Sequence, residues 1–410
     1  MKVLLVNKFL YPKGGDAKCT LATGQLLSEK GHRVDYWGMK DPANPVLPYT
    51  DTFVENIDYN GSSSVGRKIA DALKILYSLE ARAKISRIIE AVKPDIVHLH
   101  NFAHQISPSV LHILKKRSIP TVMTMHDYKL VCPAYTMYSK GAPCEKCGKG
   151  RYYHCLINKC VKGSYLKSLI SMVEMYLHFK VLRIYKNVHV FISPSAFLKN
   201  KLRDMGFNYD IIHLPNFVHI EDYLPQYQFT EKSFCYAGRL SAEKGLLTLI
   251  RAVKGLDMEL KIVGEGPLSA ELRQYARAEN ISNIRFLGYR TGDELTKEIS
   301  SSLAVVVPSE WYENNPLSII EAFAMGKPVL GARIGGIPEL VKDGETGYTF
   351  ESRNTEDLRN KILRMTSRPD QIIEMGKAAR KFVEVNNNPD KHYNRLLEIY
   401  QMASDRARRK

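Results

Sequence analysis

Short apolar runs alternate with amphipathic segments along most of the chain. The runs are rich in Val, Ile and Leu, a pattern typical of strands buried on both faces, and the segments between them carry apolar residues at helical spacing. Strand–helix alternation predicts parallel sheets with helices on both faces. We expect a first series of strands at residues 2–6, 32–37, 96–99, 121–125, 188–192 and 211–214, and a second at 233–237, 259–263, 284–286, 303–307 and 328–331.

Two series in succession predict two doubly wound α/β domains, with ligands bound at the carboxyl ends of the strands. The break between them falls in a proline-containing, non-periodic stretch at 214–230. We expect an N-terminal Rossmann-like domain at 1–215, a second at 216–385, and a C-terminal helix at 386–410 that returns toward the first. The amphipathic segments predict helices at residues 20–30, 85–92, 109–116, 246–254, 269–279 and 391–407.

One run of the second half, PSEWYENNPLSIIEAFAMGKPVLGARIGG, combines two carboxylates with a helix start. Glu313 and Glu321 are separated by seven residues. Between them, Asn315 followed by Pro316 is typical of an N-cap and the first helical position. One carboxylate then precedes the helix and the other lies inside it, near backbone N–H groups that favour an anion. This suits a nucleotide with sugar hydroxyls and a diphosphate, although a capped surface helix would explain the two acids alone.

Three further motifs place polar groups or open backbone at the ends of expected strands. GRL-x3-KG puts Arg239 after strand 233–237 and Lys244 at a helix start, where two cations can hold a diphosphate. Gly264 opens GEGP, a tight turn that lets backbone approach a ligand. Tyr289 ends FLGY, where loop backbone could read a nucleobase edge. None of these motifs is specific by itself.

The order of the motifs is specific: GRL-x3-KG, GEGP, FLGY, E-x7-E and GGIPELV-x-DG-x-TG. The series resembles the C-terminal domain of the retaining GT-B glycosyltransferases of family 4, closely over residues 234–350 and elsewhere in layout. The resemblance implies two Rossmann-like domains that face a central cleft. It implies that Arg239 and Lys244 bind the donor diphosphate and that Glu321 accepts hydrogen bonds from the ribose hydroxyls.

The same resemblance assigns the groups around the transferred sugar. It implies that Glu313 faces this sugar, with backbone contacts from Asn315, Pro316 and Leu317 to sugar and phosphate. The carbon–oxygen bond to the nucleotide would break with oxocarbenium character while the acceptor attacks from the same face, so that configuration is retained. No catalytic metal is expected, because the cations stabilise the leaving group and we find no D-x-D set at a strand end.

The first half carries the matching motifs. Gly14 and Gly15 precede the helix at 20–30 and allow close approach of a phosphate or acceptor. His100 ends one strand and His126 follows another. In the family, a histidine at the latter position lies close to the donor sugar, and the resemblance gives this role to His126. His98 alternates with His100, so at most one of them is expected to face the site, and we expect His98 to be buried and hydrogen-bonded.

Five of the seven cysteines cluster in an insert at 129–163, which departs from the family pattern. Four of them read C-x2-C-x7-C-x4-C: Cys144, Cys147, Cys155 and Cys160. Clustered cysteines in a cytosolic protein indicate metal before disulfides. A structural Zn²⁺ is our prediction, with an iron–sulfur cluster, free thiols or disulfides as alternatives. The other two cysteines are expected to be ordinary buried residues.

The net charge of +16 is concentrated in one segment. Residues 129–186 carry eleven Lys or Arg against two acids, mixed with tyrosines, a composition that suits an anionic membrane face. A solvated basic face is the alternative; no nucleic-acid-binding motif is visible, and nucleic acid is not expected as a partner. No stretch reaches the about 20 apolar residues of a membrane span. We expect a cytoplasmic protein, peripheral on the inner membrane face.

These features together predict a retaining glycosyltransferase that moves a sugar from a nucleotide donor to a polysaccharide or lipid-linked acceptor. UDP is favoured over GDP only as the more frequent choice in the family. Two alternatives remain: a nucleotide-sugar epimerase of the same architecture, and a degenerate transferase that acts as a binding module. The donor sugar, the acceptor and the oligomeric state cannot be predicted from the sequence.

Overall fold

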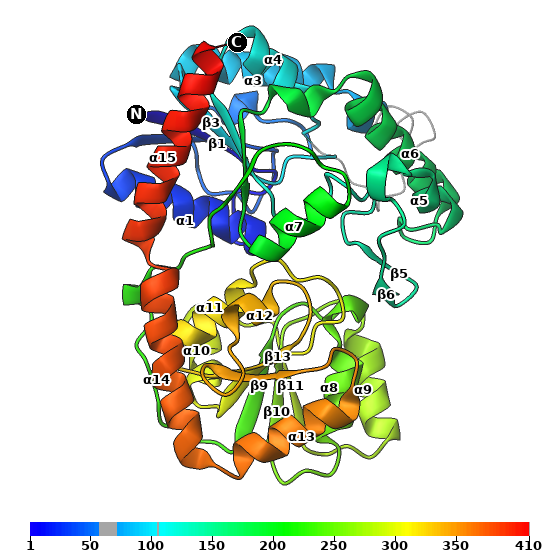
Figure 1. The fold of residues 1–410 in the computed structure, drawn as a ribbon, viewed down its shortest axis with the longest axis vertical. Helices are drawn as coiled ribbons and strands as arrows, with labels where there is room; N and C mark the ends of the chain where they lie inside the picture. The colour runs from blue at the N-terminus through cyan, green and yellow to red at the C-terminus, as the bar shows by residue number, and fades with distance from the viewer. Residues whose placement is uncertain (57–71, 105, 410) are drawn as a thin grey trace. The chain divides into compact units, whose positions relative to one another are not determined.

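The computed structural model describes residues 1–56, 72–104 and 106–409. The chain forms two units, each with its own six-stranded parallel sheet (Figure 1). The predicted pair of doubly wound α/β domains is therefore confirmed. The first unit contains Met1–Met137, Glu145–Leu214 and His392–Lys410, and the second contains Tyr138–Cys144 and Pro215–Lys391.

The sheet of the first unit has the order β2-β1-β3-β4-β7-β8. All its neighbouring strands are parallel, and the order reverses between β1 and β3. Its central strands β1, β3, β4 and β7 are almost wholly buried, as the sequence predicted, whereas the edge strands β2 and β8 are partly exposed. Their bounds are β1 Lys2–Val6, β2 Arg33–Trp37, β3 Ile96–Leu99, β4 Thr121–Thr124, β7 Val190–Ser193 and β8 Ile211–His213.

The C-terminal helix α15 (Pro389–Arg408) packs against this first sheet. Its buried stripe of Leu396, Ile399, Tyr400 and Ala403 shares one hydrophobic core with residues of the central strands. The red helix in Figure 1 accordingly runs beside β1 and β3. Among the described residues the unit also contains the helices α1 Gly15–Glu29, α3 Leu79–Val92, α4 Val110–Lys116, α5 Tyr153–Ile157, α6 Tyr165–Tyr176 and α7 Ala196–Asp204.

The sheet of the second unit has the order β11-β10-β9-β12-β13-β14, and it reverses between β9 and β12. Its strands are β9 Ser233–Ala237, β10 Glu259–Val263, β11 Ile284–Gly288, β12 Ala304–Val307, β13 Val329–Ala332 and β14 Gly347–Phe350. Its helices are α8 Leu246–Val253, α9 Ser269–Ala278, α10 Gly292–Ser300, α11 Leu317–Ala324, α12 Ile337–Leu340, α13 Thr355–Thr366 and α14 Pro369–Asn386.

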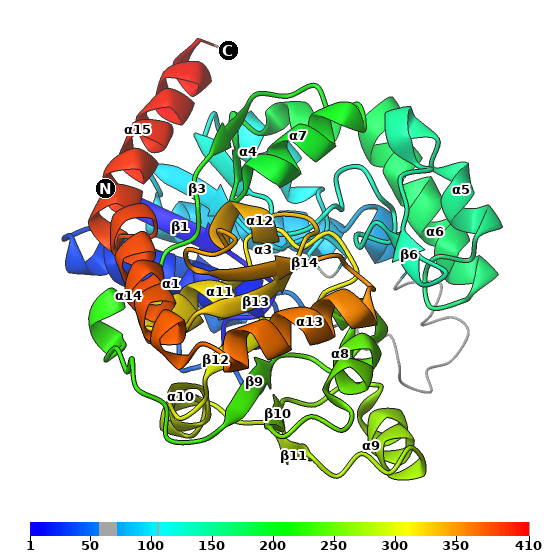
Figure 2. The same ribbon diagram turned by 60° about the horizontal axis from the view of Figure 1, so that its bottom comes forward.

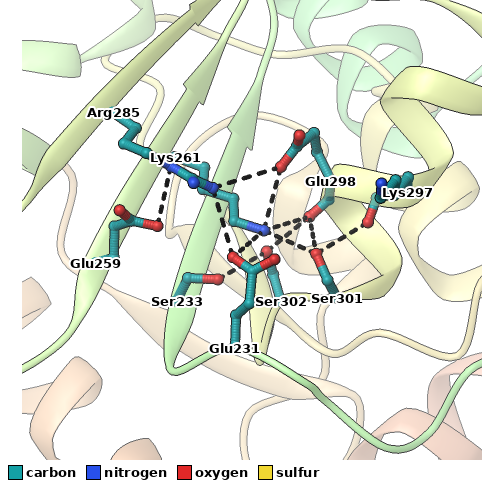
Figure 3. A network of polar contacts seen from close by, with 9 residues as sticks. All are labelled: Glu231, Ser233, Glu259, Lys261, Arg285, Lys297, Glu298, Ser301 and Ser302. Carbon is teal, nitrogen blue, oxygen red and sulfur yellow. Dashed lines mark hydrogen bonds and ion pairs between the residues drawn. The ribbon is translucent and has the colours of Figure 1, made fainter.

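A buried ionic network supports the second sheet at its amino-terminal side (Figure 3). Lys261 of β10 is fully buried, and its Nζ lies 2.7 Å from a carboxylate oxygen of Glu231 and 3.2 Å from one of Glu298. The same ammonium donates to the hydroxyl of Ser301 at 2.7 Å. Arg285 of β11 reaches both of these carboxylates. Because a buried ammonium is costly without partners, this network explains how a lysine can occupy a central strand position.

The cysteine-rich insert adds a short antiparallel hairpin, β5 (Tyr138–Ser139) and β6 (Ala142–Pro143), which belongs to the second unit. The remainder of the insert, with α5, belongs to the first unit, as does α6, which follows the insert. After α6 the chain continues as a π-helical turn at Leu177–Val181. Within the described ranges, no helix combines the length and the apolar character that crossing a bilayer would demand.

Candidate functional site

The predicted donor-site residues of the second unit lie where the strand order of its sheet reverses. Arg239 follows β9, and Glu313 lies in the loop after β12, the two strands that flank the reversal. Ligands of doubly wound sheets bind at such a point, outside the carboxyl ends of the strands. The topology therefore brings the two motifs together, although Arg239 and Glu313 are 74 positions apart in the sequence.

Lys244 and Glu313 form a direct ion pair, with Lys244 Nζ 2.7 Å from Glu313 Oε1. The hydroxyl of Ser309 donates to the same oxygen at 2.6 Å. The Glu313 side chain is almost fully buried, which by itself raises the pKa of a carboxyl group, but Lys244 and the hydrogen bonds hold the pKa of Glu313 below its usual value. The Lys244 ammonium also lies 5.0 Å from the centre of the Trp311 ring. Glu313 is thus an ionised, anchored carboxylate.

Close backbone packing fixes the loops around this pair. Gly264, after β10, has φ +133°, and a Cβ placed there would lie 1.9 Å from the carbonyl oxygen of Gly238. Gly335 has φ +62°, and a Cβ placed there would lie 2.4 Å from the carbonyl oxygen of Glu313. The next residue, Gly336, donates its N–H to the same carbonyl at 2.8 Å. Only glycine fits at Gly264 and Gly335. Four loops, those after β9, β10, β12 and β13, therefore pack backbone to backbone in two pairs around the reversal point.

The helix start was predicted one residue too early. α11 begins at Leu317, and Pro316, not Asn315, is its N-cap residue, with no side-chain capping bond. The side-chain oxygen of Asn315 accepts the backbone N–H of Asn216 at 3.0 Å, so it is not available to cap the helix. Asn216 also donates its side-chain amide to the Asn315 carbonyl at 2.9 Å. This two-point contact fixes which end of the Asn315 amide is the acceptor and thereby orients its NH₂ group.

The remaining predicted donor residues follow the carboxyl ends of strands β9, β11 and β12. Glu321 lies in the second turn of α11 and is partly buried, as is Leu317 at the helix start. Tyr289 directly follows β11 and is 67% exposed. The Arg239 side chain is also exposed. Arg239 and Tyr289 therefore remain accessible, whereas Lys244 and Glu313 are already engaged with each other.

In the first unit, the predicted residues lie at the corresponding edge of the other sheet. Gly15 is the first residue of α1, and a Cβ built on it would meet no atom within 4 Å beyond its chain neighbours and the backbone of its own helix, so this position is open to a ligand. His126 follows β4, and its Nε2 lies 2.9 Å from Nδ1 of His100, which follows β3. The two rings stack with centroids 5.2 Å apart. His100 was not assigned a role from the sequence, yet it positions the His126 ring.

A third imidazole completes a stacked column. His98 lies 4.3 Å from His100, centroid to centroid, and is hydrogen-bonded to Tyr400 at 2.9 Å and to Thr124 at 2.7 Å. The prediction that His98 is buried and hydrogen-bonded is therefore confirmed. Burial lowers the pKa of His98 to about 3 and, against the opposing effect of the nearby Asp16 carboxylate, that of His126 to about 4. These rings are neutral at neutral pH.

A small cavity lies beside this column within the first unit. Its volume is about 20 Å³, close to the space that one water molecule needs. The lining includes His100, Asn101, His126 and Asp127 together with Lys129. Asn101 is fixed in turn, because its backbone N–H donates to the side chain of Asn7 at 2.9 Å. The polar face around His126 is therefore built from the ends of three neighbouring strands.

The cysteines of the insert are all present as free thiols. Cys147, Cys155 and Cys160 belong to one hydrophobic cluster of the first unit, whereas Cys144 is part of the second unit. The hydrogen bond with Cys160 is the main cause, and burial the second, of a raised pKa at Cys155. Cys132 also acts electrostatically on Cys155, so this further cysteine lies near the cluster. Within the described residues no group of three or more His, Cys, Asp or Glu side chains is arranged to hold a metal ion. Zinc at this cluster stays a prediction.

Sequence reasoning missed several residues that contact the predicted site residues. Ser309 and Trp311 lie within the singled-out run, but nothing in their spacing indicates that they face Glu313. Asn216 lies about 100 residues before its partner, in the stretch between the two strand series, so only the folded chain reveals the contact. The His100–His126 contact was predictable in principle, because both residues follow neighbouring strands of one sheet.

Comparison with known proteins agrees with the fold and with the motifs. Residues 13–222, more than half of the chain, match the family described as Glycosyltransferase Family 4, and residues 221–382 match Glycosyl transferases group 1. The N-acetyl-alpha-D-glucosaminyl L-malate synthase of Bacillus anthracis is 22% identical over 95% of this chain and 94% of its own.

Two solved structures share the fold along nearly their whole length. The sucrose-phosphate synthase of Thermosynechococcus elongatus superposes with a TM-score of 0.73 at 20% identity, over 98% of both chains. Anabaena Alr3699/HepE, solved in complex with UDP-glucose, gives a TM-score of 0.68 at 17% identity, over 98% of this chain and 99% of that one. The GT-B fold is thus shared with proteins of low sequence identity.

Proposed function

Because the chain belongs to glycosyltransferase family 4, we propose that it transfers a sugar from a nucleotide-sugar donor to a polysaccharide or lipid-linked acceptor with retention of configuration. The observation that carries this proposal is the arrangement of Arg239, Lys244 and Glu313 at the strand reversal of the second unit. Two cations and an ionised carboxylate at this point suit a diphosphate and the sugar attached to it.

The proposed donor contacts follow from the position of each group. Arg239 and Lys244 would bind the diphosphate, and Glu321 would accept the ribose hydroxyls. The first turn of α11, with Asn315, Pro316 and Leu317, would present backbone N–H groups to phosphate and sugar. Gly264 and Tyr289 follow the two strands farther from the reversal point and would border the nucleobase. UDP is the proposed nucleotide, supported by the UDP-glucose that Anabaena Alr3699/HepE binds.

The proposed reaction needs a group that accepts charge on the leaving nucleotide and groups that orient the sugar. As the bond from C1 to the diphosphate oxygen breaks, negative charge grows on that oxygen, and the two cations stabilise it. Glu313 would orient the transferred sugar through its hydroxyls. His126, neutral and held by His100, would bind the sugar as a hydrogen-bonding group rather than as a cation. Gly15 would leave space for the phosphate or acceptor.

The acceptor side of the proposal rests on the first unit. A lipid-linked acceptor would place the protein at the inner face of a membrane, as the basic segment at 129–186 predicts. The first cysteine of the insert, Cys132, comes six residues after His126, and the insert would border the acceptor. A structural zinc in this insert is proposed as a cross-link for a loop-rich segment, and no catalytic metal is proposed.

The two alternatives are not favoured. A nucleotide-sugar epimerase needs no acceptor, whereas both family models that match this chain are those of glycosyltransferases. A degenerate binding module would be expected to have lost charged groups of the site, but Arg239, Lys244, Glu313 and Glu321 are all present.

The function is tested by incubating the protein with UDP-sugars in the presence and absence of candidate saccharide and lipid-linked acceptors. We expect UDP release that depends on the acceptor, and a product whose anomeric proton has the same configuration as the donor in ¹H NMR. Conversion of the sugar without any acceptor would identify an epimerase. An inverted product would contradict the retaining mechanism while leaving transfer intact.

A further inference from the structure

The segment of the first unit from Lys146 to Lys186 carries basic side chains and no exposed acid; Glu145, just before it, is exposed and pairs with Lys201 at 2.7 Å. Between Lys146 and Lys186 every Lys and Arg is exposed, nine side chains in all, and this segment is described without a gap. Its only acid, Glu174, is fully buried and bonds Lys129 at 2.7 Å. The net charge of the exposed residues is therefore +9. The basic residues are Lys146, Lys149, Arg151, Lys159, Lys162, Lys167, Lys180, Arg183 and Lys186.

An apolar stripe lies within this basic segment. On α6, Leu166 is 67% exposed, and Leu169 and Val173 are each 39% exposed. Their spacing of three and four residues places them on one face of the helix. Tyr165 at the helix start is 59% exposed and Ile157 at the end of α5 is 63% exposed. Figures 1 and 2 show α5 and α6 side by side at the periphery of their unit.

The helix that presents this stripe is held firmly from its opposite face. Ser168, Ser171 and Met175 are buried against the unit, and the buried Glu174–Lys129 ion pair ties α6 to the loop after β4. Ser164 caps the helix start by accepting the N–H of Lys167. The exposed leucines therefore belong to an ordered, amphipathic helix, and their exposure does not result from local unfolding.

We infer that α6 lies in the plane of an anionic lipid bilayer, with Leu166, Leu169 and Val173 inserted among the acyl chains and the surrounding lysines on the headgroups. An apolar stripe flanked by lysines is the composition of helices that bind the membrane interface. The Lys159 ammonium lies 4.2 Å from the centre of the Tyr165 ring, and tyrosine and lysine side chains both favour the level of the headgroups. Basic clusters add electrostatic attraction to anionic lipids.

Two other occupants of this surface are disfavoured by its chemistry. A second copy of the chain would bring nine positive charges against nine, which is repulsive without intervening acids. Nucleic acid would satisfy the charges but not the exposed leucines and valine, because phosphate contacts do not cover aliphatic side chains. An anionic bilayer matches both the charge and the apolar stripe.

The test measures binding of the full chain to vesicles by sedimentation, without donor or acceptor. The vesicles are phosphatidylcholine alone or a mixture with phosphatidylglycerol. We expect binding to the anionic vesicles only, and a steep loss between low and high salt. The variant Leu166→Ser with Val173→Ser should bind at least tenfold more weakly, and Lys162→Gln with Lys167→Gln should bind more weakly with a smaller salt dependence. Leu363→Ser on α13, where the leucine is 45% exposed, is the matched control and should bind like the wild type.

Several results would overturn the inference. Equal binding by the Leu166/Val173 variant and the wild type, with unchanged far-UV circular dichroism for both, would show that the stripe does not insert. Equal binding to neutral vesicles would remove the role of charge. A dimer in sedimentation velocity that this variant abolishes would assign the stripe to a second copy. Tight oligonucleotide binding without vesicle binding would assign the surface to nucleic acid. None of these results bears on glycosyl transfer to a water-soluble acceptor, so this inference and the proposed function fail independently.

Discussion

The ammonium of Lys244 lies 2.7 Å from the carboxylate of Glu313, and this ion pair joins the two motifs expected to serve different parts of one donor. Lys244 is expected at the diphosphate and Glu313 at the transferred sugar. Each group partly neutralises the other, so a donor must compete with Glu313 for Lys244. The coupling also predicts that a change at either residue alters the electrostatics of the other.

The first prediction concerns the two carboxylates. Glu313→Gln keeps the shape of the side chain but removes the charge that competes with the donor for Lys244, so UDP binding should be retained or tightened while turnover falls at least tenfold. Glu321→Gln should instead weaken UDP binding, because a hydrogen bond to a charged group contributes about 1.5–3 kcal/mol. Calorimetric titration with UDP and steady-state kinetics distinguish the two effects. Exchanged phenotypes would mean that the sugar and the ribose are assigned to the wrong carboxylates.

The second prediction concerns the cations. Arg239→Ala or Lys244→Ala should each lower kcat/KM at least tenfold, because each removes a charge-assisted contact to the diphosphate. Lys254→Ala is the control, since that lysine is half exposed and pairs with Glu279 after α8, away from the strand reversal. If all three variants behave like the wild type, the diphosphate does not bind at this strand end.

The third prediction concerns stability at acid pH. An unfolded histidine has a pKa near 6.5, whereas the pKa is about 4 for His126 and about 3 for His98 in the folded protein. Between pH 6 and pH 4 the unfolded chain therefore binds more protons, and stability falls as the pH decreases. Each ring contributes a slope of up to about 1.4 kcal/mol per pH unit.

Denaturant unfolding at several pH values, monitored by fluorescence, checks this slope. His98→Asn should reduce the slope between pH 6 and pH 4 by the contribution of one ring and leave the pH dependence above 7 unchanged. A wild-type stability that is constant from pH 7 to pH 4.5 would contradict burial of neutral imidazoles.

The fourth prediction concerns the cysteine cluster. A loop-rich segment with a small core is stabilised by a metal cross-link, so the purified protein should carry about one equivalent of Zn²⁺ for a closed four-ligand site. Cys147→Ser and Cys155→Ser should lose the metal in elemental analysis, and Cys19→Ser should retain it. Comparing Cys144→Ser with Cys132→Ser identifies the fourth ligand.

Loss of the metal should affect acceptor use more than UDP binding, because the insert is expected to border the acceptor side. A colourless, metal-free protein with full activity and an ordered insert would contradict the zinc prediction and leave packed thiols as the explanation.

Much of the fold was predictable because the strands are continuous apolar runs. β1, β3, β9 and β10 have the expected bounds. The strand β14 was not expected, since its four residues GYTF follow directly on a glycine-containing turn and show no apolar run. The predicted start of α11 was wrong because the side-chain oxygen of Asn315 accepts a hydrogen bond from Asn216. The local sequence around Asn315 does not indicate this contact.

The candidate site was predictable in its residues but not in its contacts. Motif order indicated Arg239, Lys244, Glu313 and Glu321. That Lys244 pairs with Glu313 follows only from the strand order, which places β9 beside β12. The basic segment was visible in the sequence, whereas the exposed stripe on α6 required knowledge of which helix face is buried.

Nucleotide binding tests the central claim most directly, because ligand binding to the native state raises the melting temperature by mass action. The wild type is heated with UDP, GDP or no nucleotide, beside Arg239→Ala under the same conditions. UDP at about 100 times its Kd should stabilise the wild type by about 2.7 kcal/mol, and the same UDP concentration should stabilise Arg239→Ala far less. If no nucleoside diphosphate shifts the melting temperature of the wild type, the second unit is not a nucleotide-sugar site and the account is contradicted.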